Sequence, residues 1–156
     1  MSHSVAHHLV AIAELLEEYG YARVSDVARR LGITRGSVSI TLKGLKQKGF
    51  VTDDERRFLG LSDEGRTITD SIRAKKAVMK DLFVRFLRVD EEQADQDTCK
   101  LEHLISPDTA IRAQTLLDFL DSGAQEATEF LDAFGSFADG NGGGKTRRKA
   151  AGRKKR

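Results

Sequence analysis

Three residues near position 100 carry side chains that could bind one metal ion together. Glu102 and His103 follow Cys99 by three and four residues. In a helix these spacings share one face, so a thiol, a carboxylate and an imidazole project toward one point. Divalent transition metals accept all three groups as ligands. A single cysteine is also common as a buried apolar residue, but its two neighbours in this pattern favour metal ligation.

The elements that must position this triplet are mainly helical. The chain of 156 residues has one proline and no tryptophan, which is typical of a helical fold. Short apolar runs at 50–52 and 58–61 predict one β-hairpin. Apolar periodicity predicts helices over about 5–18, 90–104, 107–120 and 124–137. Three more are predicted from capping residues: one from Ser25 to a turn at Gly32, one from Thr34 to about Lys48, and one from Ser62 to about Phe86.

The order of elements between residues 24 and 61 is that of a winged helix-turn-helix. Such a motif places the first turns of its second helix in the major groove of DNA. We expect Arg35 to read bases, because an arginine fork matches the acceptors of guanine. Thr34, Lys43 and Lys46 are expected on phosphates, and the wing arginines on the backbone or minor groove. The candidate DNA-binding residues are Thr34, Arg35, Ser37, Ser39, Lys43, Lys46, Arg56 and Arg57.

Charge is unevenly distributed along the chain. Residues 145–156 hold eight of the 26 basic residues and no acidic one, so the rest of the chain has 18 basic residues against 24 acidic ones. No carboxylate occurs between Asp26 and Asp53, where six basic residues lie. An acid-free basic region is the pattern expected of a surface that meets phosphate. The basic end, which follows a glycine-rich linker, is expected to contact DNA without reading sequence.

Four stretches of the sequence carry a resemblance to a known family. They are EEYGYARVSDVARRL at 17–31, SVSITLKGLKQKGFV at 37–51, LSDEGR at 61–66, and FLRVDEE followed by CKLEHLIS within 86–106. In these stretches the chain resembles the DtxR/MntR family of iron- and manganese-dependent repressors. The resemblance implies a mainly α fold with a winged helix-turn-helix DNA-binding domain at 1–65 and an all-helical dimerisation and metal-binding domain at 66–138. Residues 139–156 are expected to be a disordered linker and basic tail.

The resemblance also implies a fourth ligand from the first helix. The matching position is His7, where relatives carry methionine or aspartate, and His8 takes its place if the alignment slips by one residue. A second, ancillary metal position of the family is degraded here. Lys76 and Lys80, or Ala77 in a shifted register, match its histidine and glutamate on the long helix, and a glutamate on the first helix is matched by Val10. We expect one ion per protomer, with a lysine supplying the charge of the missing ion.

A site of one thiolate, two imidazoles and one carboxylate suits Fe(II) or Zn(II), and suits Mn(II) less well. The expected function is therefore a metal-dependent transcriptional regulator, a repressor by resemblance, that binds operator DNA as a homodimer. No apolar run is long enough to span a membrane, and the polar start of the chain is unlike a signal peptide, so we expect a cytoplasmic protein. No enzymatic motif and no small-molecule substrate are expected. Two alternatives remain open: a metal-independent winged-helix regulator that responds to oxidation or a small ligand, and a nucleoid-associated architectural protein.

Overall fold

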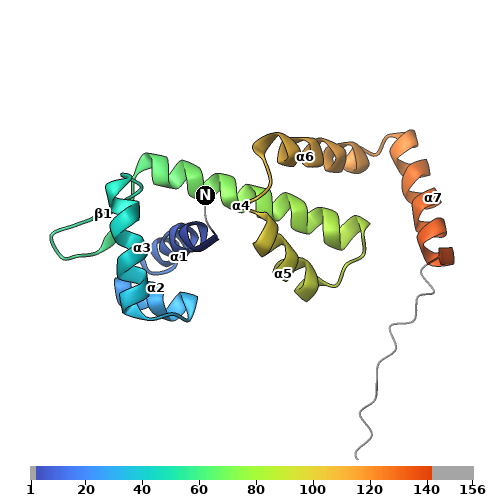
Figure 1. Ribbon diagram of the computed structural model, residues 1–156. Helices are drawn as coiled ribbons and strands as arrows, with labels where there is room; N and C mark the ends of the chain where they lie inside the picture. Colours follow the sequence, from blue (N-terminus) through green and yellow to red (C-terminus); the bar gives the residue numbers. More distant parts are fainter. Residues whose placement is uncertain (1–2, 142–156) are drawn as a thin grey trace, which may run out of the picture. The chain divides into compact units, whose positions relative to one another are not determined.

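The computed structural model of the chain describes residues 3–141, which form seven helices, a π-helical turn and one hairpin (Figure 1). Most of the segment expected to be a disordered linker and basic tail lies outside these residues, although the last helix continues to Asn141. No helix among the described residues has the length and apolar character needed to cross a bilayer. The elements are α1 (His3–Tyr19), α2 (Val24–Leu31), α3 (Arg35–Gln47), β1 (Val51–Asp53), β2 (Leu59–Leu61), α4 (Asp63–Asp81), η1 (Leu82–Phe86), α5 (Glu91–Leu101), α6 (Pro107–Asp121) and α7 (Gln125–Asn141).

The chain divides into two compact units whose boundary lies inside α6, after Gln114. The first unit holds α1 to α5, the hairpin and the start of α6. The second holds the rest of α6 and α7, where Leu117, Leu120 and Ala127 are buried. On α7 the rings of Phe130 and Phe134 stack with centroids 6.0 Å apart.

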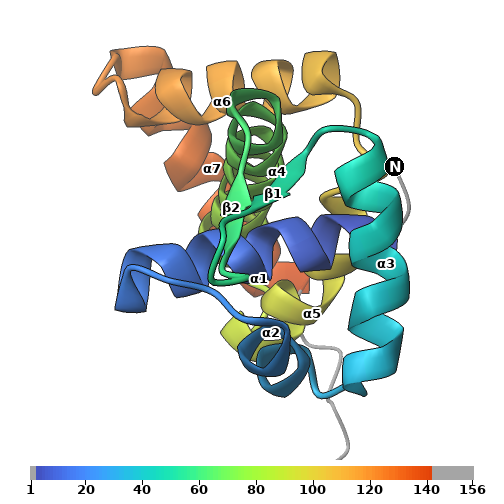
Figure 2. The ribbon, with the colours of Figure 1, turned by 90° about the vertical axis from the view of Figure 1, so that its left-hand side faces the viewer.

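The core of the first unit is formed by α1, α2, α3 and the hairpin. Leu9 and Ile12 of α1 are fully buried against Val27 of α2 and Val38 of α3. Apolar residues recur every three or four positions on each helix, so one face of each is covered. Figure 2 shows α1 crossing behind the hairpin while α3 runs along one side. The core leaves the opposite face of α3 exposed.

Capping side chains fix the starts of two helices as predicted. The Thr34 hydroxyl accepts a hydrogen bond from the Ser37 amide at the start of α3, and the Ser62 hydroxyl accepts one from Gly65 at the start of α4. The predicted cap at Ser25 is wrong, because α2 begins at Val24 and Arg23 occupies the cap position without a side-chain bond. Gly32 ends α2 in the left-handed region with φ 66°, which makes the turn into α3.

The hairpin is antiparallel, with Val51 opposite Leu61. Its second strand is tied to the entry of α2, since the Leu59 amide donates to the Ala22 carbonyl at 2.8 Å. A Cβ atom at Gly65 would lie 2.1 Å from the Phe50 carbonyl oxygen, so only glycine lets α4 start this close to the hairpin. The start of α4 is therefore rigidly placed on the winged domain.

The long helix predicted to reach about Phe86 is interrupted. Regular α-helix ends at Asp81, and Leu82–Phe86 form the π-helical turn η1. The Asp90 carboxylate then caps α5 by accepting hydrogen bonds from the amides of Glu92 and Gln93. In Figure 1, α5 lies alongside α4, which it contacts. This arrangement returns the end of α5 toward the start of α1.

Candidate functional site

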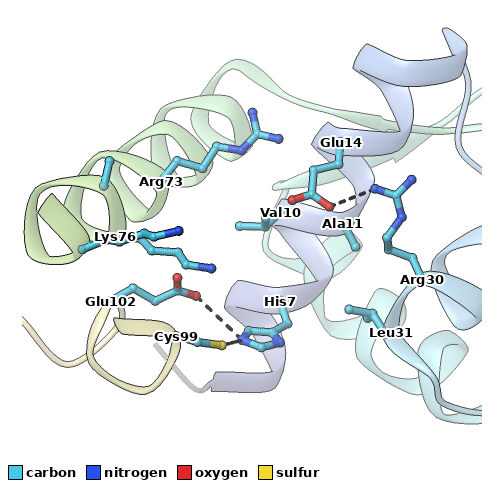
Figure 3. Close-up of a pocket in the computed structure, with 12 residues that line it drawn as sticks. His7, Val10, Ala11, Glu14, Arg30, Leu31, Arg73, Lys76, Cys99 and Glu102 are labelled. Carbon is cyan, nitrogen blue, oxygen red and sulfur yellow. Dashed lines mark hydrogen bonds and ion pairs between the residues drawn. The ribbon is translucent and has the colours of Figure 1, made fainter. Parts of the chain in front are cut away.

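The end of α5 meets the first turns of α1, which brings predicted metal ligands together. His7 Nε2 lies 3.2 Å from Cys99 Sγ and 3.8 Å from Glu102 Oε1. Figure 3 shows these three side chains converging, His7 from α1, Cys99 from α5 and Glu102 from the turn that follows α5. His7 and Cys99 are 92 positions apart in the chain, so the fold, and not the local sequence, creates the contact.

His3, which the sequence analysis did not select, belongs to the same cluster. Donor atoms of His3, His7 and Cys99 all lie within 4.8 Å of one another, a grouping that could hold a metal ion. The His3 and His7 rings have centroids 3.9 Å apart. A signal for His3 was present in the sequence, because residues 3 and 7 are one helical turn apart on one face.

The other two candidate histidines differ in their surroundings. The predicted helix over 90–104 ends at Leu101, so His103 lies in the following turn and not on the helix. Its ring packs edge-on against His3 at 5.0 Å, which joins it to the cluster. His8 is 2 % exposed and its Nδ1 donates to the Ser4 carbonyl of its own helix. His7, and not His8, is the residue that faces Cys99.

Burial controls the protonation of the cluster. It lowers the pKa of His7, with further lowering by the nearby His3 and His103. The pKa of His103 is lowered mainly by burial and then by His3. Burial raises the pKa of Cys99, and the Glu102 carboxylate raises it further. The neutral imidazoles are in the form that binds metals, whereas the thiol must lose a proton to do so.

The residues fit a bound cation. Glu102 is only 5 % exposed, and burial raises the pKa of its carboxyl, an effect that Lys76 opposes. The Nδ1 atom of His103 is buried with no hydrogen-bond partner among the described residues. A buried carboxylate and an unpaired buried ring nitrogen both cost free energy that a shared cation would offset.

Beside the cluster lies a cavity of about 360 Å³ between α1, α2 and α4, lined by His7, Val10, Glu14, Lys76 and Lys80 among others. Basic side chains on α4 are already engaged with α5. Lys80 Nζ lies 2.9 Å from Asp95 and 3.2 Å from Glu91, and Lys76 lies 3.8 Å from Asp95. Lys76 and Lys80, the positions expected to replace ancillary metal ligands, therefore carry ammonium groups that are paired with acidic residues.

The predicted DNA-binding residues lie on the exposed side of α3 and on the hairpin, but several of their polar groups are used within the chain. The Thr34 and Ser37 hydroxyls are 2.9 Å apart at the helix cap, and the Ser39 hydroxyl donates to the Arg35 carbonyl. Arg35 and Lys43 are exposed and carry no ion pair within residues 3–141. Of the basic residues on α3, these two are the unpaired ones, and they are available to DNA phosphates or bases.

Other basic residues of the region are partly committed to the fold. Lys46 Nζ lies 2.6 Å from Asp53 of β1, which joins α3 to the hairpin. Arg30 pairs with Glu14 and Glu18, which joins α2 to α1. At the hairpin tip, Asp54 Oδ1 accepts hydrogen bonds from the amides of Arg56 and Phe58, and the two tip arginines are exposed.

An exposed apolar residue lies on α3 and was not predicted from the sequence. Ile40 is 77 % exposed, more than any other large apolar residue that the structure describes. Its position between Val38 and Leu42, both buried, was a signal that it points outward.

Comparisons with known proteins agree with this architecture. A family model described as the iron dependent repressor, metal binding and dimerisation domain matches residues 62–130, and a model of the MarR family matches residues 4–57. The transcriptional regulator MntR of Shouchella clausii is 30% identical over 116 residues, which cover 74% of this chain and 80% of that protein. MntR of Bacillus pumilus is 28% identical over 126 residues, covering 81% and 87%.

Solved structures share the fold. The structure of T. acidophilum IdeR superimposes with a TM-score of 0.63 at 23% identity and covers 72% of this chain. The match spans 53% of the length of IdeR, so this chain corresponds to about half of that protein.

Proposed function

Since this chain belongs to the DtxR/MntR family of metal-dependent transcriptional repressors, we propose that it binds operator DNA when a divalent transition-metal ion joins α1 to the end of α5. The observation that carries the proposal is the approach of His7 Nε2 to Cys99 Sγ and Glu102 Oε1, at 3.2 and 3.8 Å. A bound ion supplies positive charge that allows a thiolate and a carboxylate to share this buried point.

The ligand set supports Fe(II) or Zn(II) over Mn(II). The proposed ligands His7, Cys99, Glu102 and His103 offer one sulfur, one oxygen and two ring nitrogens. The donor atoms grouped within 4.8 Å are those of His3, His7 and Cys99, while Glu102 lies 3.8 Å from His7 and the His103 ring centroid 5.0 Å from that of His3. Thiolate and imidazole suit iron and zinc, whereas manganese favours oxygen-rich sites.

The surroundings of the cluster support one ion per protomer. Val10, Lys76 and Lys80 line the adjoining cavity, and none of these side chains is a ligand of divalent metals at neutral pH. The carboxylate of Glu14, which also lines the cavity, is paired with Arg30 at 3.1 Å. Lys76 lowers the pKa of Glu102 and of Cys99 by its charge. The ammonium group of Lys76 thus favours the ionised forms of Glu102 and Cys99, as a second metal cation would.

The chain's own contacts connect this cluster to the DNA-binding face. His7 lies on α1, whose buried face packs against α2 and α3. When α1 is held to the end of α5, the orientation of α3 is set relative to α4 and α5. We assign residues 66–138 to dimerisation, so the two α3 helices of a dimer acquire one spacing and read half-sites about 34 Å apart or a multiple of it.

Exposed apolar surface supports a homodimer. A cavity of about 360 Å³ between α4 and the start of α6 is lined by Val78, Pro107 and Ile111 among others, and Ile111 is 64 % exposed. Apolar surface of this kind is typical of subunit contacts. We propose a protein of the cytoplasm, where chromosomal DNA is reached, and no enzymatic activity, since its relatives are transcriptional regulators.

Titration with Zn(II), and with Fe(II) under anaerobic conditions, tests the proposal when metal stoichiometry and binding to the DNA upstream of the protein's own gene are measured together. We expect one ion per protomer and a large gain in DNA affinity. His103→Ala and Cys99→Ala should lose that gain. Lys100→Ala should keep it, because Lys100 is exposed and its ion pair among the described residues is with Asp97. DNA binding that ignores metal in the wild-type protein would overturn the proposal.

The same experiment separates the two alternatives. A redox-responsive regulator would lose DNA binding with peroxide and not with chelator. Burial raises the pKa of Cys99, which makes the thiol less reactive and argues against this role. An architectural protein would bind every duplex alike, with a steep dependence on salt.

A further inference from the structure

The outward face of α3 is centred on an apolar residue. Ile40 is 77 % exposed, while Val38 and Leu42, two residues to either side, are buried. Because successive residues turn by about 100°, a residue two positions from another on a helix points roughly 160° away from it. Ile40 therefore points away from the core of its own domain.

Two glycines flank Ile40 at one helical turn on each side. A Cβ atom at Gly44 would meet nothing within 4 Å, and one at Gly36 would meet only the Thr34 hydroxyl at 3.8 Å. Packing within the chain does not require glycine at either position. Glycine is less favourable in a helix than alanine, so its presence here leaves room for something outside the chain to approach the backbone.

The charges around this face indicate what approaches. Lys43 follows Ile40 by three residues and shares its face, and Arg35 stands at the N-terminal end of α3. Both are exposed and have no ion pair within the described residues, and no acidic residue lies on α3. Nearby hydroxyl groups already form hydrogen bonds within the chain, since the Ser37 hydroxyl lies 2.9 Å from that of Thr34 and the Ser39 hydroxyl donates to the Arg35 carbonyl. The face therefore combines free positive charge with an apolar centre, which is complementary to the phosphate-lined major groove and not to an apolar protein surface.

We infer that Ile40 reads thymine in the major groove through the C5 methyl group, with Gly36 and Gly44 allowing α3 to approach the base edges closely. Among the groups exposed on the edges of base pairs in the major groove, this methyl is the apolar one. The inference rests on the DNA-binding function proposed above and adds the base and the group that the protein recognises there. Ile40 thus acts on the same helix as Arg35, which was expected to read guanine.

The test begins with in vitro selection of a duplex that the protein binds. Metal-loaded protein selects from a library of duplexes with a random core of about 30 base pairs, which is long enough for two half-sites. In the selected duplex, each thymine is replaced in turn by uracil, which removes only the methyl group. We expect at least one thymine in each half-site at which the loss lowers affinity roughly fourfold, the effect of one buried methyl group.

Ile40→Ala identifies the partner of that methyl group. At the sensitive thymine, the variant should bind thymine and uracil duplexes equally, so the two changes are not additive. Ile33→Ala, at an exposed isoleucine in the preceding turn, should keep the full preference for thymine. A preference for thymine that survives in Ile40→Ala, or the absence of any sensitive thymine, would overturn the inference.

Gly44→Ala provides a second measurement. The added methyl group meets no atom of the chain, so the melting temperature should stay the same or rise, while affinity for the selected duplex falls. Unchanged affinity would overturn the close approach. Failure to select any sequence in the presence of metal would instead contradict the proposed function itself, which separates the two conclusions.

Discussion

Cys99 is the residue through which pH should most strongly affect metal binding. Burial raises the pKa of its thiol above the ordinary value of about 8.5, so near neutral pH the proton must leave when an ion binds. The burial-lowered pKa of His7 keeps that ring neutral in the same range. Metal affinity should therefore rise about tenfold per pH unit between about pH 6.5 and 8.5, one proton being released for each ion.

Isothermal calorimetry with Zn(II) across that range measures the dependence. Cys99→Asp is the matched variant, because its carboxyl is already ionised throughout and its affinity should vary little with pH. A wild-type affinity independent of pH, or a variant with the same slope as the wild type, would show that Cys99 does not release a proton to solvent when the ion binds.

The residue scale also shows where sequence reasoning reaches its limit. Cys99, Glu102 and His103 could be selected because they lie within one turn, but the partners of Cys99 could not be found by spacing. His7 was proposed through family resemblance, and His3 was missed although it stands one turn before His7. His3 and His7 approach Cys99 because α5 runs back along α4. This is a tertiary arrangement, so no local sequence pattern predicts it.

At the scale of elements, α1 and α4 face each other across the cavity beside the cluster. Val10 and Lys76 line that cavity together with His7 and Glu102. The double variant Val10→Glu with Lys76→His would restore the ligand types that relatives place there, and should bind two ions per protomer where the wild-type protein binds one. Metal content by elemental analysis after dialysis gives the stoichiometry.

Val10→Glu alone is the control for this change. It adds a carboxylate but keeps the ammonium group of Lys76 in the cavity, so it should still bind one ion. Two ions in the wild-type protein would contradict the single-site proposal, and one ion in the double variant would show that the cavity cannot form a second site.

Helix boundaries followed from the sequence wherever a capping side chain decides them. Thr34 and Ser62 cap α3 and α4 as expected, because their hydroxyls satisfy amides that no residue of the helix can reach. Ser25 has the same chemistry but lies inside α2, where packing of Val24 and Val27 sets the start of the helix. The π-helical turn at Leu82–Phe86 was not predicted, since its apolar residues continue the helical pattern.

At the scale of the whole molecule, the basic end of the chain should strengthen DNA binding without changing its specificity. Residues 145–156 carry eight basic residues and no acidic one. Deleting residues 140–156 should lower affinity for all duplexes alike, and should reduce the slope of log affinity against log salt by up to about 7 if every cation contacts phosphate. Titrations at several salt concentrations with a selected and an unrelated duplex measure both quantities.

Replacing the eight basic residues by glutamine in the full-length chain is the matched control, because it keeps the length and removes the charge. It should behave like the deletion. A fall in affinity confined to the selected duplex would mean that this segment takes part in sequence recognition.

The separation of 92 residues between His7 and Cys99 has a consequence for the order in which the protein is made. Every residue of the buried core around α1, α2, α3 and the hairpin lies at or before Leu61, with Ile68 packed against it. A nascent chain therefore contains all of that core before Cys99 has been synthesised, and domains fold as units from the N-terminus during synthesis. The DNA-reading head can form before the chain can detect metal at all, so control by the ion begins only after about two thirds of the chain, through His103, has been synthesised.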